Sequence, residues 1–76
     1  MTHDGTWGAF DKIAKMLGLS VSGLAKGCGL DATAFNKSKR WTRYGKPRWP
    51  STGTVAKVIA YANITAEEFI KLTQEN

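Results

Sequence analysis

The chain has 76 residues, 42% of them hydrophobic, and eleven Lys and Arg against six Asp and Glu give a net charge of +5. This length excludes a second independent core, and the hydrophobic content is too high for a disordered tail. The positive charge favours a polyanion or an anionic membrane surface as partner. The single cysteine excludes an internal disulfide. With only one cysteine and one histidine, the sequence predicts neither a metal site nor a cofactor.

Two further classes are disfavoured by the pattern of apolar residues. No apolar run approaches the roughly 20 residues of a membrane span, and the start lacks the basic region and apolar stretch of a signal peptide. We therefore expect a cytoplasmic protein that does not enter membranes. The sequence contains no paired acid–base set or phosphate-binding loop, so we do not expect an enzyme.

The first two predicted helices are short and carry clear boundary signals. Thr6 is placed to cap a helix that starts at Trp7, and Gly18 is placed to end it. Ser20 is placed to cap a second helix that Gly29 closes. We expect residues 1–5, which include His3, to form a flexible and solvated N-terminus. The apolar stripe of the first helix consists of Trp7, Phe10, Ile13, Ala14 and Leu17.

Three more helices are predicted after Leu30. Asp31 is expected to cap a third helix over residues 32–39 whose Phe35 faces the core. Residues 40–50 read as an exposed loop because Gly45, Pro47 and Pro50 resist helix continuation. The caps predicted for the remaining two helices are Ser51 and the stop Asn63 for the fourth, and the capping box Thr65–Glu68 for the fifth.

These elements predict an all-α, compact five-helix domain over residues 6–73. We expect residues 74–76 to form a C-terminal tail, which would serve as a linker if another domain follows. Phe69, Ile70 and Leu72 of the fifth helix are a candidate dimer face, or alternatively close the core.

The second and third helices have the spacing of a helix-turn-helix. Leu24-Ala25 is followed after three residues by Gly29-Leu30, and Phe35 comes five residues later. A small residue permits the close crossing, and glycine permits the tight turn. Such a unit projects its second helix into the major groove of DNA.

With these residues the chain resembles the lambda-repressor-like (XRE-type) regulators. The matching segments are Leu19-Ser20, Gly23-Leu24-Ala25-Lys26, Gly29-Leu30 and Ile64-Thr65-Ala66-Glu67-Glu68-Phe69. The stretch 31–40, with Pro47-Arg48-Trp49-Pro50-Ser51-Thr52, is similar to the N-terminal part of bacterial phage-repressor-like regulators. In many of those a LexA-like self-cleaving peptidase domain follows, so we expect either an excised domain or a short stand-alone relative.

The resemblance implies a recognition helix at 32–39 and sequence-specific binding of double-stranded DNA by a transcriptional regulator, a repressor. Asn36 matches adenine, and Lys37 matches guanine. The implied base contacts are Ala32, Thr33, Asn36 and Lys37. A homodimer on a palindrome would add affinity and specificity.

Charge placement predicts the phosphate contacts. No acid lies between Asp31 and Glu67, and six of the eleven basic residues fall between Lys37 and Arg48, interleaved with large aromatic residues. Cations alternating with rings favour a phosphate-binding surface over a merely solvated charge run. The predicted phosphate contacts are Ser20, Lys39, Arg40, Arg43, Tyr44, Lys46 and Arg48.

Alternatives remain open. The loop at 40–49 is long enough to reach the adjacent minor groove instead of the phosphates, and Gly45-Lys46-Pro47-Arg48 partly resembles the core of an AT-hook. The same fold could serve as a protein-interaction module, antitoxin-like or specific for an acidic partner. RNA binding is a third hypothesis, which the aromatic residues permit.

Overall fold

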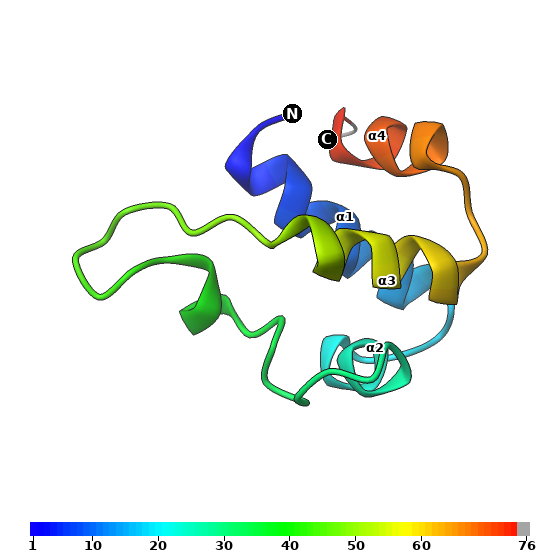
Figure 1. Cartoon of the computed structure of the whole chain (residues 1–76), viewed down its shortest axis with the longest axis horizontal. Coiled ribbons are helices and arrows are strands. Elements are labelled where there is room, and N and C mark those ends of the chain that lie inside the picture. Colours follow the sequence, from blue (N-terminus) through cyan, green and yellow to red (C-terminus); the bar gives the residue numbers. More distant parts are fainter. Residues whose placement is uncertain (75–76) are drawn as a thin grey trace.

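The computed structural model describes residues 1–74. Within them the chain forms four α-helices and one short 3₁₀ helix, and no strand (Figure 1). The all-α class is therefore confirmed. The predicted C-terminal tail at 74–76 begins one residue too early, because Gln74 is still the last residue of the final helix. Residues 75–76 of that tail lie outside the described part. The elements are α1 (His3–Met16), α2 (Val21–Gly27), η1 (Lys37–Arg40), α3 (Thr52–Ala62) and α4 (Ala66–Gln74).

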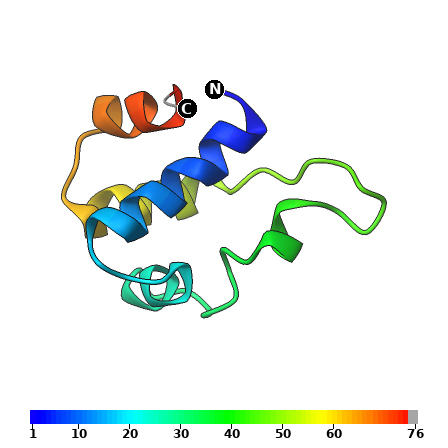
Figure 2. The same cartoon turned by 180° about the vertical axis from the view of Figure 1, so that it is seen from behind.

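The four α-helices form one unit, called here the helical body. In Figures 1 and 2, α1 and α3 lie between α2 on one side and α4 on the other. Phe10 is fully buried, and its ring lies 4.7 Å from that of Phe35, 5.5 Å from that of Trp7 and 5.8 Å from that of Phe69. The core is thus centred on α1 and brings residues from near the N-terminus and near the C-terminus into contact, as the apolar spacing predicts.

Close helix contacts are made possible by two glycines. A Cβ at Gly5 would collide with the carbonyl oxygen of Thr73, where α1 meets α4. A Cβ at Gly27 would collide with the ring of Tyr61, where α2 meets α3. Lys12 also donates from Nζ to the carbonyl oxygen of Leu72 at 2.9 Å. The backbones of α1 and α4 therefore approach each other closely at Gly5, and the backbone of α2 lies against a side chain of α3 at Gly27.

Most predicted helix boundaries are confirmed. Ser20 and Ser51 accept hydrogen bonds from Gly23 N at 3.0 Å and Thr54 N at 3.1 Å. Asn63 ends α3 in the left-handed conformation, with φ of 57°. Thr65 N donates to the carboxylate of Glu68, and Glu68 N donates to the hydroxyl of Thr65, both at 3.0 Å. These bonds satisfy backbone donors that the helix itself leaves free.

The start of α1 differs from the prediction. Thr2, not Thr6, is the N-cap, and its hydroxyl accepts from Gly5 N at 2.9 Å. Thr6 is buried inside the helix and donates its hydroxyl to the carbonyl oxygen of Thr2. At the other end Leu17 is 42% exposed, since it lies beyond the last helical turn. The helix therefore begins four residues earlier than the apolar stripe indicates.

The predicted third helix does not form as an α-helix, so the expected five α-helices and the helix-turn-helix arrangement are not confirmed. Turns occupy residues 32–35, and the short η1 follows. The backbone bonds span three residues, as from Ala34 N to Asp31 O and from Lys39 N to Asn36 O. The carbonyl oxygen of Phe35, which Lys39 N would bond in an α-helix, accepts from Arg40 Nη2 at 3.0 Å instead.

Among the described residues no helix is long and apolar enough to cross a bilayer.

Candidate nucleic-acid interface

Residues 40–48 fold into a hairpin, called here the basic hairpin, which projects from the helical body (Figures 1 and 2). Arg48 N donates to Arg40 O at 2.9 Å, and Thr42 N donates to Lys46 O at 2.7 Å. Trp41 and Pro47 form an antiparallel bridge between these two bonds. The predicted exposed loop is therefore present, and its two arms are paired along their length.

The tip of the basic hairpin has a defined turn. Gly45 N donates to Thr42 O at 2.9 Å, and Gly45 has a φ of +78°, a conformation that side chains disfavour. The hydroxyl of Thr42 accepts from Tyr44 N at 3.3 Å and from Lys46 N at 3.1 Å. A three-residue turn that ends in a left-handed glycine is a common hairpin connection. The backbone of the tip is thus fixed by the hydrogen bonds that its N–H groups donate to Thr42.

Arg40 fastens the first arm to α1. Its guanidinium bonds Asp11 at 2.8 and 3.1 Å in a two-point ion pair, and its carbon lies 5.4 Å from the Trp7 ring centroid. The Arg40 side chain is only 12% exposed. The predicted phosphate contact by Arg40 does not fit this position, because the guanidinium faces inward and already neutralises a carboxylate.

Two further bonds fasten the arms. Trp7 donates from Nε1 to Arg48 O at 2.8 Å, and His3 bonds Arg40 O through Nε2 at 2.6 Å. The His3 ring also lies 4.6 Å from the Trp41 ring and 5.8 Å from the Trp49 ring. The prediction of a solvated His3 in a flexible terminus is wrong, since its side chain is 11% exposed. His3 holds the first arm of the basic hairpin and also contacts Trp49, which follows the second arm.

His3, Trp7 and Asp11 form a stripe that sequence reasoning missed. They are spaced by four residues, so they share one face of α1. Their partners lie between 29 and 41 positions away, too far for any local pattern to reveal. The regular spacing of two polar groups and an indole N–H on one helix face is the signal that could have indicated an anchoring surface.

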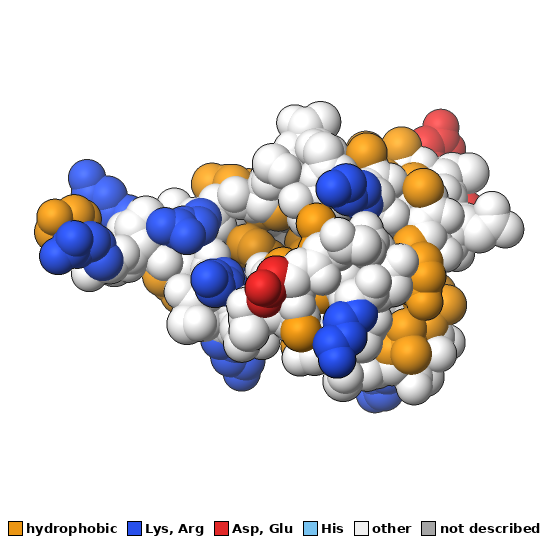
Figure 3. Space-filling view, turned by 60° about the horizontal axis from the view of Figure 1, so that its bottom comes forward, with side chains coloured by type: hydrophobic (Ala, Val, Ile, Leu, Met, Phe, Trp, Pro, Cys, Tyr) orange, Lys and Arg blue, Asp and Glu red, His pale blue; other side chains and the backbone are white. Residues whose placement is uncertain are grey.

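The remaining predicted phosphate contacts face outward. Tyr44 is 78% exposed, and the guanidinium of Arg43 lies 5.3 Å from its ring. Figure 3 shows Lys and Arg side chains flanking a hydrophobic one at the protruding end of the molecule. Ser20 is also exposed, but it lies before α2 and caps that helix. The exposed cations of η1 and the basic hairpin are Lys37, Lys39, Arg43, Lys46 and Arg48.

The predicted base-contacting residues do not share a helix face. Ala32 is half-buried, and Thr33 donates its hydroxyl to Asp31 at 2.6 Å. Asn36 is half-buried at the start of η1, whereas Lys37 is exposed. The Thr33 hydroxyl and Thr33 N–H, in that order, lower the pKa of Asp31, which keeps a negative charge beside these residues. Asp31 thus accepts from Thr33 as predicted for a cap, but an α-helix does not follow it.

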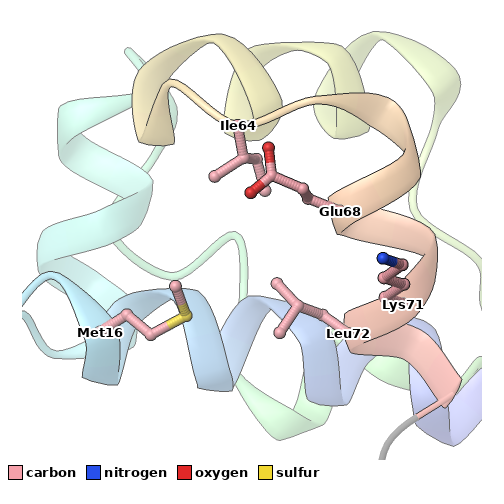
Figure 4. Close-up of a pocket in the computed structure, with 5 residues that line it drawn as sticks. All are labelled: Met16, Ile64, Glu68, Lys71 and Leu72. Carbon is pink, nitrogen blue, oxygen red and sulfur yellow. The ribbon is translucent and has the colours of Figure 1, made fainter.

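A pocket lies away from the basic hairpin, between the end of α1 and α4 (Figure 4). Its lining combines apolar side chains with Glu68, which is engaged in the capping box with Thr65. Hydrogen bonds from Thr65 N–H and the Thr65 hydroxyl, in that order, lower the pKa of Glu68. The lining residues are Met16, Ile64, Glu68, Lys71 and Leu72.

None of the protein-family models, curated proteins and solved structures with which the chain was compared matches it.

Proposed function

We propose that this chain binds double-stranded DNA as the DNA-binding domain of a transcriptional regulator. The observation that carries the proposal is the basic hairpin, which presents cations outward from a stretch of chain without a single acid between Asp31 and Glu67. Duplex DNA carries one negative charge per about 1.7 Å of axis, so a projecting row of cations gains affinity by releasing counterions.

The proposed phosphate contacts are those side chains that face solvent. The rigid turn and the anchors on α1 favour binding, because little loop ordering remains to oppose it. Tyr44 adds a hydroxyl that can donate to a phosphate, and Ser20 can do the same while its oxygen caps α2. The cations in this set are Lys37, Lys39, Arg43, Lys46 and Arg48; Arg40 is assigned to the anchor instead.

Base recognition is proposed to involve Asn36 and Lys37, whose chemistry matches adenine and guanine. Thr33 and Ala32 contribute less, since the Thr33 hydroxyl is bonded to Asp31 and Ala32 is half-buried. A single small domain reads few base pairs, so a homodimer on a palindrome is proposed to complete the site. Ile70 on α4, 43% exposed, is the candidate for its interface. Occupation of such a site would repress transcription by excluding polymerase.

Fluorescence anisotropy with a randomised duplex pool tests the proposal. With five phosphate contacts, log affinity is expected to fall with log salt with a slope of about −4.5. The double variant Arg43→Ala/Arg48→Ala should reduce the magnitude of that slope by about 2. The control Lys71→Ala removes one exposed cation from α4, at the opposite end of the molecule from the hairpin tip (Figure 1), and should leave the slope unchanged.

Three outcomes would contradict the proposal. Absence of duplex binding at low salt would favour an acidic protein partner instead. A reduction of the slope by about 1 in the Lys71→Ala control, half that of the double variant, would mean that net charge, not the basic hairpin, determines binding. Tighter binding of a single-stranded or hairpin RNA than of any selected duplex would favour the RNA hypothesis.

A further inference from the structure

At the tip of the basic hairpin, Arg43 to Lys46, most of the hydrogen-bonding side-chain groups are donors. The arginine and lysine side chains only donate, and the exposed Tyr44 hydroxyl can donate or accept. The hydroxyl oxygen of Thr42 could accept, but it already receives bonds from Tyr44 N and Lys46 N. Residues 41–49 contain no Asp, Glu, Asn or Gln. The surface that suits such a tip is therefore one lined by acceptors.

The two DNA grooves differ in this respect. The floor of the minor groove at A·T pairs presents only acceptors, adenine N3 and thymine O2, whereas G·C pairs add the donor N2 amino group. In the major groove every base pair presents at least one donor, which amide and carboxylate side chains read. The charged side chains of the tip, which only donate, match the minor groove at A·T pairs and are opposed there by the guanine amino group.

Shape and electrostatics agree with this match. The minor groove is about 6 Å wide, which admits a side chain from a narrow turn but excludes a helix. Gly45 keeps the turn narrow, because no side chain projects from its left-handed position. Narrow A·T tracts concentrate negative potential and attract arginine. Arg43 is held by the turn with its guanidinium against the exposed Tyr44 ring.

We propose that the tip of the basic hairpin enters the minor groove of A·T-rich duplex DNA, where Arg43 and Lys46 donate to adenine N3 and thymine O2. This inference rests on the proposed binding of duplex DNA and adds the groove and the base-pair class. The anchors of Trp7 and His3 on the two arms hold the tip in position for insertion.

The test uses three duplexes of equal length whose central tracts contain A·T, G·C or inosine·cytosine pairs. Inosine lacks the N2 amino group, so an inosine·cytosine pair resembles A·T in the minor groove and G·C in the major groove. We expect the A·T and inosine·cytosine duplexes to bind about equally, each about fivefold or more tightly than the G·C duplex.

The outcomes separate the two proposals. If the inosine·cytosine duplex binds like the G·C duplex, the tip reads the major groove and the inference is wrong. If all three bind alike, the basic hairpin contacts phosphates only, and the inference is wrong while the proposed function holds. If none binds at low salt, the proposed function itself fails.

The variant Arg43→Lys locates the preference within the hairpin. It keeps the charge but removes the planar guanidinium. The affinity for the G·C duplex should therefore stay within about twofold, while the ratio of A·T to G·C affinity should fall towards one. Lys71→Ala on α4 is the matched control and should keep the full preference. Because Arg43 is exposed, far-ultraviolet circular dichroism should be unchanged in both variants. An undiminished preference in Arg43→Lys would contradict the role of Arg43.

Discussion

The helical body and the basic hairpin are held in place by different interactions. In the body the core side chains, such as Phe10 and Leu24, are fully buried. In the hairpin Trp41 is 46% exposed and Tyr44 is 78% exposed, and Trp49, which follows it, is 51% exposed. Hydrogen bonds and one ion pair from α1 hold the hairpin instead. Folding and binding can therefore be perturbed separately in this molecule.

The first helix belongs to both regions. One face carries Phe10 and Ile13 into the core, and another carries His3, Trp7 and Asp11 to the hairpin. Trp7 does both, because its ring packs against Phe10 while its Nε1 bonds Arg48 O. The position of the hairpin thus depends on an intact α1, but the fold of the body does not depend on the tip.

The largest expected effect is that of a truncation in the core. Phe10→Ala should cost about 3–5 kcal/mol, which is comparable to the entire stability of a domain of this size, so the variant should be largely unfolded. Tyr44→Ala at the exposed tip should change the free energy of unfolding by less than about 0.5 kcal/mol. Urea denaturation followed by circular dichroism measures both. A cooperative transition of Phe10→Ala near that of the natural chain would contradict this assignment of the core.

An intermediate effect is expected at the junction of the two regions. Asp11→Ala leaves the largely buried guanidinium of Arg40 without its carboxylate, and should cost about 1–3 kcal/mol of stability. DNA affinity should fall as well, because the first arm loses an anchor. The double variant Asp11→Ala/Arg40→Met should recover part of the stability, since no buried charge remains. Strictly additive losses in a double-mutant cycle would show that the pair does not interact.

The smallest effect concerns the capping box of α4. Its hydrogen bonds hold the pKa of Glu68 below the ordinary value of 4.5, so the folded state binds the proton less tightly than the unfolded state. The resulting stability is present above the unfolded pKa and is lost as the pH falls through the lower folded pKa. The gap in melting temperature between the natural chain and Glu68→Gln should therefore be present at neutral pH and close in acid. A gap that widens in acid would contradict the capping role.

Local rules predicted the helix boundaries because the groups involved lie within about four residues of each other. Ser20, Ser51, Asn63 and the Thr65–Glu68 box needed no tertiary information. The predicted helix at 32–39 failed for the opposite reason. Asp31 does accept a bond from Thr33 N as a cap would, but no α-helix follows, because Arg40 takes the carbonyl oxygen of Phe35 and is itself placed by Asp11 on another element.

The candidate site, like the helix boundaries, was predicted only where local sequence determines the outcome. Charge placement indicated that Arg43, Lys46 and Arg48 face solvent, and they do. Charge alone could not distinguish Arg40 from them, because burial depends on the distant Asp11. The pairing of the two arms was also invisible, since it needs the turn at Gly45 and the hydroxyl of Thr42 together.

Nuclear magnetic resonance of the ¹⁵N-labelled protein, titrated with a short A·T-rich duplex, tests the central claim most directly. If the basic hairpin binds DNA, the largest shift changes will occur at the amides of residues 37–48, and the Trp7 indole N–H will follow because it bonds Arg48 O. The amide resonances of α4 will shift little. The largest changes around Met16, Ile64 and Leu72, with the hairpin unaffected, would contradict the account.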